Sequence, residues 1–482
     1  MSNPLKKLAG HTAIYGLSSI IGRLLNYLLV PLYTYKFTNP ADYGVVAELY
    51  AWVAFLIVLL SFGMETTYFR FSQKKENEKS VYSSCFKIVS IINILFLSII
   101  FLFNNQIASA MLFENHSEYI IVLGIIVSLD SFSAIPLARL RAKEKAVKFS
   151  IIQISSILLN IILNLIFFLV LFDSKNPEQG VLFILLANLI SAAIKPILLI
   201  KEYFDLSFVK NRELTKKILL YASPLVIAGF AGIINETLDR ALLKHLLVEN
   251  QYSLEYAEAQ VGIYSACYKL AMLVTILLQA YRYAAEPFFF SQAKNENKNE
   301  IYAQIMNYFI GIVCFAFLAV SLNIEILKYF IQNPAYWVGL KIVPILLLAN
   351  VFLGIYFNQS IWYKLSGKTK FGAYIALIGA SLTIFINIIY VPIYGYWACA
   401  WATLIVYFTQ MLISYFLGQK HYPIPYNLKR FFLYIGVSIA LFFIATEIVI
   451  ENSYLDLVVK NIIVVLFATL VYKVEKTKKI AL

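Results

Sequence analysis

The sequence predicts an all-α integral membrane protein with about fourteen transmembrane helices. Of its 482 residues, 61% are hydrophobic, and these fall in long blocks. We find fourteen such blocks, from His11–Tyr35 to Leu457–Tyr472. Most have the ~20 apolar residues that one helical crossing of a bilayer requires. Almost no sequence remains for a soluble domain, so the function is expected to take place within or across the membrane.

The positive charges indicate which ends of the helices face the cytoplasm. If the N-terminus is cytoplasmic, the cytoplasmic segments hold 27 Lys and Arg residues and the opposite loops hold four: Lys36, Lys175, Lys244 and Lys328. The positive-inside rule predicts this distribution. We therefore expect both termini in the cytoplasm. Insertion topology and attraction to anionic lipid explain the net charge of +13, so no nucleic-acid partner is predicted.

The reactive residue types give no indication of a metal, disulfide or cofactor site. The four Cys residues lie in apolar blocks without a CxxC pair, and the four His residues have no ligand spacing. The longest outside segments, near Asn104–Glu118 and His245–Gln260, have only about 15 residues. They leave no room for a catalytic domain outside the membrane.

An internal repeat predicts two lobes related by a pseudo-two-fold axis. Gly44 and Tyr50 align with Gly262 and Tyr268, and the later string FSQ at 71–73 aligns with FSQ at 290–292. Both copies start outside and end inside, so the repeat is parallel and its axis runs along the membrane normal. Such repeats are typical of transporters.

The repeat sets the expected domain boundaries. We predict an N-terminal lobe of helices 1–6 at residues 1–200 and a C-terminal lobe of helices 7–12 at 218–418. Between them, 201–217 mixes apolar residues with five cations and is expected to form an amphipathic helix on the cytoplasmic surface. Helices 13 and 14, with the cytoplasmic tail, occupy 419–482.

Several short strings resemble those of bacterial polysaccharide flippases. Gly63–Phe71 resembles the family's G-x-E-x-x-x-x-R-F ending of helix 2, and Asp42–Gly44 resembles its x-Y-G start. Leu238–Arg240 followed by Val261–Ala266 is similar to L-D-R and V-G-I-Y-S-A, and Glu286–Phe288 resembles the P-F helix end. These flippases belong to the multidrug/oligosaccharidyl-lipid/polysaccharide exporter superfamily.

The resemblance implies a two-lobed transporter rather than an enzyme, working by alternating access without a cofactor. It would move an undecaprenyl-pyrophosphate-linked oligosaccharide from the inner to the outer leaflet of the bacterial cytoplasmic membrane. The glycan would serve surface polysaccharide such as O-antigen of lipopolysaccharide, capsule or exopolysaccharide. The implied partners are this lipid-linked sugar, membrane lipids and other polysaccharide-assembly proteins.

Four deep cations are the candidate substrate-binding residues. A charged residue at the centre of a spanning helix costs about 2.5–3.5 kcal/mol on insertion scales, so each needs a reason. Arg23 lies at the middle of the first block, which contains no Asp or Glu, and a guanidinium can grip a phosphate through its planar fork. Arg240, Lys269 and Arg282 follow on helices 7 and 8. We expect them to favour a pyrophosphate, with ion pairs to neighbouring helices as the alternative.

A second group of charges is predicted to act in gating or charge pairing. Glu236 and Arg240 are four residues apart and share a helix face with Asp239 alongside, and Arg282 and Glu286 have the same spacing. Glu65 and Arg70 close helix 2. Four other lysines lie near helix ends and are expected to snorkel to the interface: Lys87, Lys195, Lys341 and Lys460.

Three other functions compete with this hypothesis. A multidrug exporter coupled to cations would use buried carboxylates such as Asp130, Glu236 and Asp239, but Arg23 would repel a cationic drug. A flippase for the peptidoglycan precursor lipid II would share the fourteen helices and the cationic cavity. A membrane-integral glycosyltransferase or polymerase needs an acid, base or metal-binding group, yet the sequence has no DxD or HExxH motif.

Overall fold

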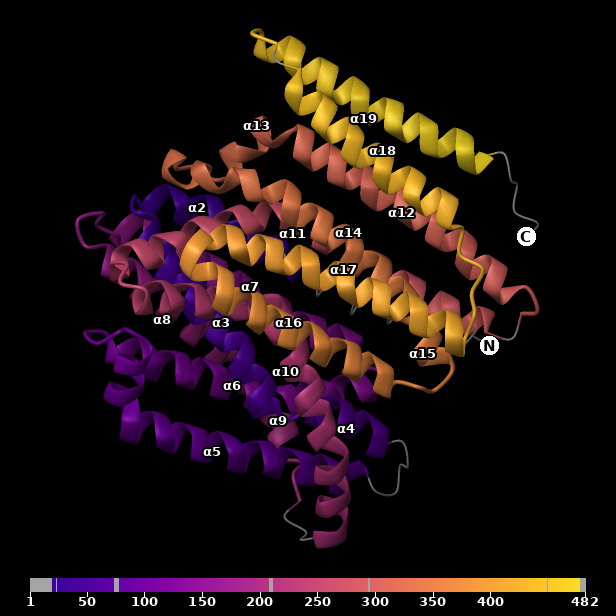
Figure 1. Ribbon diagram of the computed structural model, residues 1–482. Coiled ribbons are helices and arrows are strands. Elements are labelled where there is room, and N and C mark those ends of the chain that lie inside the picture. The colour runs from indigo at the N-terminus through magenta and orange to yellow at the C-terminus, as the bar shows by residue number, and fades with distance from the viewer. Residues whose placement is uncertain are drawn as a thin grey trace. The chain divides into compact units, whose positions relative to one another are not determined.

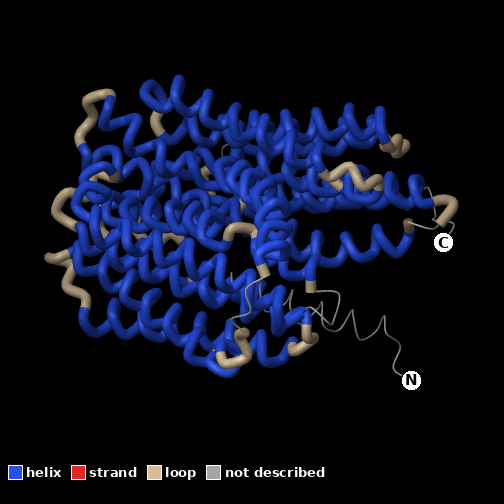
Figure 2. Tube along the Cα trace, turned by 90° about the horizontal axis from the view of Figure 1, so that it is seen from below, coloured by secondary structure: helices blue, strands red, loops and turns tan. Residues whose placement is uncertain are grey.

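The computed structural model describes residues 20–22, 24–72, 78–207, 211–293, 295–448 and 450–476. Within these ranges it consists of helices joined by loops (Figure 2), and thirteen helices are long and apolar enough to cross a membrane. Of the first predicted span, His11–Tyr35, residues 11–19 and 23 lie outside the described residues, and the rest is mainly helical. The predicted fold class, a polytopic all-α membrane protein, is confirmed.

The chain divides into two compact units, unit 1 (Met1–Gly262) and unit 2 (Ile263–Leu482). Their boundary lies within helix α11 (Leu254–Gln292). The predicted lobes, divided at 201–217, were defined by the sequence repeat, whereas the two units are defined by how compactly the chain packs. The division into two six-helix lobes therefore stays a prediction.

Unit 1 is built from helices that run alongside and across one another (Figure 1). Helix α6 contacts α3, α5 and α8, while α10 packs against α3. The bounds are α2 Leu29–Lys36, α3 Pro40–Ser61, α4 Met64–Phe71, α5 Glu78–Ala110, α6 Ser117–Ala142, α7 Ala146–Ile166, α8 Pro177–Leu198, α9 Ile200–Tyr203 and α10 Arg212–Glu249. A π-helical turn, Phe167–Leu171, extends α7.

In unit 2, α14 and α17 form the most extensive pairing, α16 covers α17, and α18 and α19 pack against α12 (Figure 1). The bounds after α11 are α12 Lys298–Leu322, α13 Ile324–Leu327, α14 Val343–Gln359, α15 Ile361–Leu365, α16 Lys370–Tyr394, α17 Tyr396–His421, α18 Leu428–Glu447 and α19 Ser453–Lys476. Two 3₁₀ segments, Lys328–Phe330 and Pro334–Ile342, precede α14. Arg430 and Glu475, 2.6 Å apart, join α18 to the end of α19.

The end of the predicted linker belongs to a long helix. Asn211 accepts a hydrogen bond from the Leu214 N–H and caps α10, which continues from Arg212 to Glu249. Since neither Gly nor Pro interrupts the chain between Arg212 and the apolar residues from Ile218 onward, the helix does not end there. Residues 212–217 are therefore the first turns of α10 rather than a separate surface helix.

The glycine of the G-x-E motif has a conformational role. Phe62 and Gly63 both have left-handed backbone angles, with φ of 48° and 62°, and they separate α3 from α4. A residue with a side chain rarely adopts this conformation, whereas glycine does so without steric cost. The motif thus marks the point where helix 2 breaks before its last turns.

The two glycines paired by the sequence repeat meet at a close helix crossing in unit 1. A Cβ added to Gly44 would lie 1.9 Å from the carbonyl oxygen of Glu258, and one added to Gly262 would lie 1.9 Å from that of Pro40. Glu258 lies four residues before Gly262, and Pro40 lies four residues before Gly44. The contact is therefore reciprocal, which is what a two-fold repeat requires, and only glycine permits backbones to approach this closely.

We predict that Gly44→Ala destabilises the protein because the new methyl group would collide with backbone that cannot move independently. Overpacking of this kind typically costs about 1–3 kcal/mol. The measurement is the apparent midpoint of thermal unfolding in detergent, which should fall by several degrees. Gly232→Ala in α10 is the matched control, because a Cβ there meets nothing within 4 Å. Equal midpoints for the two variants would contradict the close crossing.

Candidate functional site

The predicted substrate-binding cations are distributed over both units. Arg23 lies outside the described residues. Arg240 is on α10 in unit 1, whereas Lys269 and Arg282 are on the part of α11 that belongs to unit 2. Their predicted convergence on one cavity remains a prediction.

The predicted pairing of Glu236 with Arg240 takes a different form. The Arg240 guanidinium donates to the backbone carbonyl of Glu236 at 3.1 Å, and it lies 3.8 Å from the carboxylate of Asp239. Asp239 is buried while Glu236 is exposed. A buried carboxylate needs a neighbouring cation more than an exposed one does. Asp239, rather than Glu236, is therefore the carboxylate that lies beside Arg240.

The two cations of α11 differ in exposure. Lys269 is half-buried, whereas Arg282 is exposed and its guanidinium lies 4.9 Å from the centre of the Phe357 ring. The expected Arg282–Glu286 pair is replaced by a pair between helices, since Glu286 lies 2.7 Å from Lys364 at the end of α14–α15. The Arg282 side chain is thus exposed while its guanidinium lies beside the Phe357 ring.

Glu65 and Arg70 also have partners that the sequence did not predict. Glu65 pairs with Arg141 at the end of α6, and Arg70 stacks over the Tyr221 ring of α10 at 4.4 Å. Five residues along one helix place two side chains on different faces, which explains why they do not pair with each other. Both residues instead connect α4 to its neighbours within unit 1.

A buried charge cluster that the sequence did not reveal joins α3, α10 and α11 in unit 1. Lys244, expected in an outside loop, lies within α10 and is fully buried. Its ammonium is 2.6 Å from the Glu48 carboxylate and 4.0 Å from that of Glu258. It also donates to the Met111 carbonyl at 2.8 Å and lies 3.6 Å from the centre of the Phe113 ring.

Lys244 does not extend toward the membrane surface but forms an ion pair that connects α10 to α3. The side chains of Lys244 and Glu48 are 0% and 1% exposed, so neither charge is solvated by water. The remaining oxygen of Glu48 accepts from the Trp52 indole N–H at 3.3 Å. A buried pair of this kind fixes which helix faces meet, because breaking it leaves one uncompensated charge.

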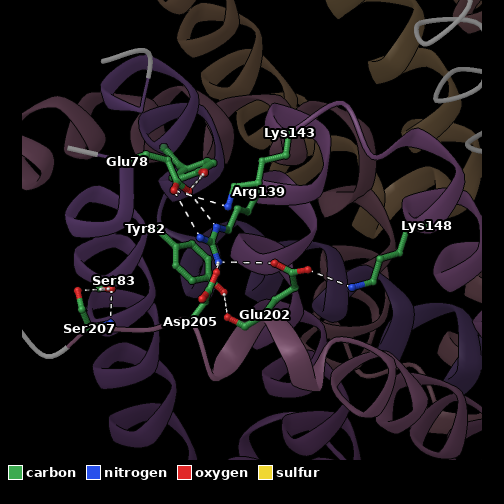
Figure 3. A network of polar contacts seen from close by, with 10 residues as sticks. Glu78, Tyr82, Ser83, Arg139, Lys143, Lys148, Glu202, Asp205 and Ser207 are labelled. Atoms are coloured by element: carbon green, nitrogen blue, oxygen red, sulfur yellow. Dashed lines mark hydrogen bonds and ion pairs between the residues drawn. The ribbon is translucent and has the colours of Figure 1, made fainter. Parts of the chain in front are cut away.

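A second network lies where α4, α5, α6 and α9 end or begin (Figure 3). Arg139 is only 2% exposed and contacts three carboxylates: Glu78 at 2.9 Å, Asp205 at 2.9 Å and Glu202 at 3.6 Å. Its guanidinium also stacks on the Tyr82 ring at 4.2 Å. Arg139 is one of the 27 cations that the sequence predicts in cytoplasmic segments, and in the structure it is the centre of a buried network.

Two lysines complete the Arg139 network. Lys148 lies 3.0 Å from Glu202, and Lys143 lies 3.7 Å from Glu78. At the exposed edge, Arg139 holds the pKa of Asp205 below its ordinary value. A lowered pKa in the folded state stabilises the fold above the ordinary pKa, and this contribution is lost as the pH falls through the lowered value. The attachment of the α9–α10 loop should therefore weaken in acid.

The acidic residue of α6 that a drug exporter would require is also paired. Asp130 lies 2.8 Å from Lys195 of α8. It lines a cavity of about 100 Å³ together with Tyr50 and Asn188. In the described part of the chain no group of three or more His, Cys, Asp or Glu residues could hold a metal ion. A carboxylate that is already paired with a lysine is poorly suited to bind a second cation.

The fold is similar to those of several solved structures. The structure superimposes on one titled "Lipid II flippase MurJ, inward closed conformation" with a TM-score of 0.73 and 15% identity, covering 95% of this chain and 97% of that one. An inward-facing multidrug resistance MATE family transporter of the MOP superfamily gives 0.62 and 14% identity, covering 82% and 93%. A MATE structure in the straight conformation gives 0.61 and 14%, covering 87% and 96%.

The sequence shows the family to which the chain belongs. Residues 8–292 match the family described as polysaccharide biosynthesis protein. The match covers more than half of the chain, so the protein belongs to this family, and the predicted resemblance is confirmed. The curated proteins include no match.

We predict that Lys244→Met destabilises unit 1 strongly, because Glu48 would keep its charge in an apolar interior without a cation. Breaking one side of a buried pair typically costs about 3–5 kcal/mol. The double variant Glu48→Gln/Lys244→Met removes both charges and should recover much of the loss. The apparent unfolding midpoint in detergent measures all three, and Lys217→Met, at an exposed position of the same helix, is the control.

A double variant as unstable as Lys244→Met would show that the effect comes from lost packing and not from the orphaned charge. A midpoint of Lys244→Met equal to that of Lys217→Met would show that Lys244 is not buried in a pair at all.

Proposed function

We propose that the protein flips undecaprenyl-pyrophosphate-linked oligosaccharide from the inner to the outer leaflet of the bacterial cytoplasmic membrane. The glycan would be used for a surface polysaccharide such as O-antigen, capsule or exopolysaccharide. The chain works as a two-lobed transporter by alternating access, with both termini in the cytoplasm. The observation that carries this proposal is membership in the polysaccharide biosynthesis family together with the fold of a superfamily exporter.

The chemistry of the cargo fits the deep cations. A pyrophosphate carries several negative charges, and guanidinium and ammonium groups in a low-dielectric setting stabilise them far more than they would in water. We assign this role to Arg23, Arg240, Lys269 and Arg282. Of the three that the structure describes, Arg282 is exposed and stacked on Phe357, which leaves its N–H donors accessible to an anion.

The carboxylates argue against a cation-coupled multidrug exporter. Two of the three carboxylates that such an exporter was expected to use, Asp130 and Asp239, have a cationic group within 4 Å, Lys195 and Arg240, respectively. The third, Glu236, is exposed rather than buried, and the buried Glu48 is paired with Lys244. A cationic drug would have to displace one of these groups or bind beside it. This arrangement favours an anionic cargo.

A lipid II flippase is the second candidate, because the structure of that name gives a TM-score of 0.73, above the 0.62 of the inward-facing multidrug transporter. The fold does not distinguish the two lipid-linked cargoes. An enzyme that extends or ligates the glycan is the third candidate, and it differs from both flippases in changing the mass of its substrate.

Reconstitution in proteoliposomes distinguishes these candidates. Purified protein is supplied with radiolabelled lipid-linked oligosaccharide or lipid II, and the label exposed to an impermeant sugar-oxidising reagent is followed over time. We expect the oligosaccharide lipid to change leaflet without a change of mass. Faster movement of lipid II would favour the second candidate, and a change of mass would favour an enzyme.

In cells, we predict that Arg23→Ala abolishes surface polysaccharide at an unchanged protein level, because the pyrophosphate loses its planar donor fork. Arg23→Lys keeps the charge without the fork and should retain part of the function. The measurement is glycan on the cell surface normalised to protein in the membrane. Normal glycan in Arg23→Ala cells would show that Arg23 does not hold the headgroup.

A further inference from the structure

A groove of about 800 Å³ between α5 and α10 of unit 1 is separate from the charges discussed above. We propose that it binds an anionic glycerophospholipid, with the phosphate at the N-terminal ends of the two helices and an acyl chain along their next turns. This inference does not depend on which cargo the protein moves.

The cationic end of the groove is formed by three side chains from two helices. Arg212 and Lys216 lie four residues apart on α10, and Lys87 faces the same groove from α5. All three are exposed, and none of the described residues that line the groove is acidic. The lining therefore carries three positive charges, which complement a phosphate diester.

Hydroxyl groups lie beside these cations. Ser83, Ser84 and Thr215 line the groove, and so does Ser90, whose buried hydroxyl has no hydrogen-bond partner among the described residues. A buried hydroxyl without a partner costs free energy unless something supplies one. The glycerol and ester oxygens of a phospholipid are acceptors of the right chemistry for this donor.

The groove changes from polar to apolar along both helices in the same direction. On α10 the lining positions 212, 215, 216, 219, 220 and 223 form one helix face, and Leu219 and Leu220 follow the cations by one turn. On α5 the apolar Ile88 and Ile91 follow Lys87. A charged head followed within one or two turns by exposed aliphatic surface matches the amphipathic profile of one lipid molecule.

The surrounding surface is consistent with a lipid-facing groove. Leu220 is 66% exposed, and along α5 the exposed apolar residues continue beyond Ile91, including Ile94 and Leu95. Such a surface is expected to contact acyl chains. Basic pockets between transmembrane helices on the predicted cytoplasmic side are known sites for anionic headgroups. Simple snorkelling would explain each lysine separately, but not three cations around one groove with a hydroxyl that lacks a partner.

The test is lipid binding to purified full-length protein, measured by native mass spectrometry with added phosphatidylglycerol or phosphatidylcholine. The variant Lys87→Gln/Arg212→Gln/Lys216→Gln removes the three groove cations. Its matched control, Lys79→Gln/Lys201→Gln/Lys217→Gln, removes three exposed cations from the same region that do not line the groove. Each cation near an anionic lipid contributes to the binding free energy. We therefore expect phosphatidylglycerol affinity to fall about tenfold or more in the groove variant only.

A second variant tests the apolar part without changing the cations. Leu220→Glu places a carboxylate where the acyl chain would begin and should also weaken phosphatidylglycerol binding, while Leu220→Met should not. Equal losses in the groove variant and its control, or equal binding of phosphatidylcholine and phosphatidylglycerol by the wild type, would overturn the proposal. Undecaprenyl pyrophosphate displacing phosphatidylglycerol from the wild type at lower concentration would also overturn it, by making the groove a cargo site.

Discussion

The low dielectric of the membrane is the constraint on which the rest of this structure depends. A charge in that setting must be matched by a partner or bind a ligand, because the cost of leaving it alone is several kcal/mol. Unit 1 meets this requirement with three helix-joining arrangements, around Lys244, Lys195 and Arg139. Each pairs a cation of one helix with a carboxylate of another. None of these three cations is among the four that we assign to the cargo.

The glycine crossing and the charge clusters act on the same helices. Gly44 lets α3 approach α11 so closely that backbone meets backbone, and Glu48, one turn further along α3, pairs with Lys244 of α10. Three helices are thus fixed by one steric and one electrostatic contact. Both contacts are intolerant of small changes, which would suit the rigid-body movement that the proposed alternating access requires.

The fold class followed from the sequence because bilayer thickness imposes a length on every spanning block, and the repeat glycines were recognisable because they recur with polar flanks. Partners of individual charges did not follow, because they come from distant segments. Arg139 and Lys244 appeared to be loop cations when only their distance from an apolar block was considered. Glu48 was the available signal: a carboxylate within an apolar block requires a cation nearby. The i, i+4 spacing also predicted Glu236 rather than Asp239 as the partner of Arg240. Spacing alone does not show which of the two carboxylates is buried.

We propose that Arg23, Arg240, Lys269 and Arg282 bind a pyrophosphate, so the most direct test is how binding depends on the charge of the headgroup. The dissociation constants of undecaprenyl pyrophosphate, undecaprenyl phosphate and undecaprenol are measured on purified wild-type protein in the same detergent. We predict affinity in that descending order, with the alcohol weakest, because the prenyl chain is common to all three and only the charge of the headgroup differs. Equal affinity for the alcohol and the pyrophosphate would show that the tail alone is recognised and would contradict the account.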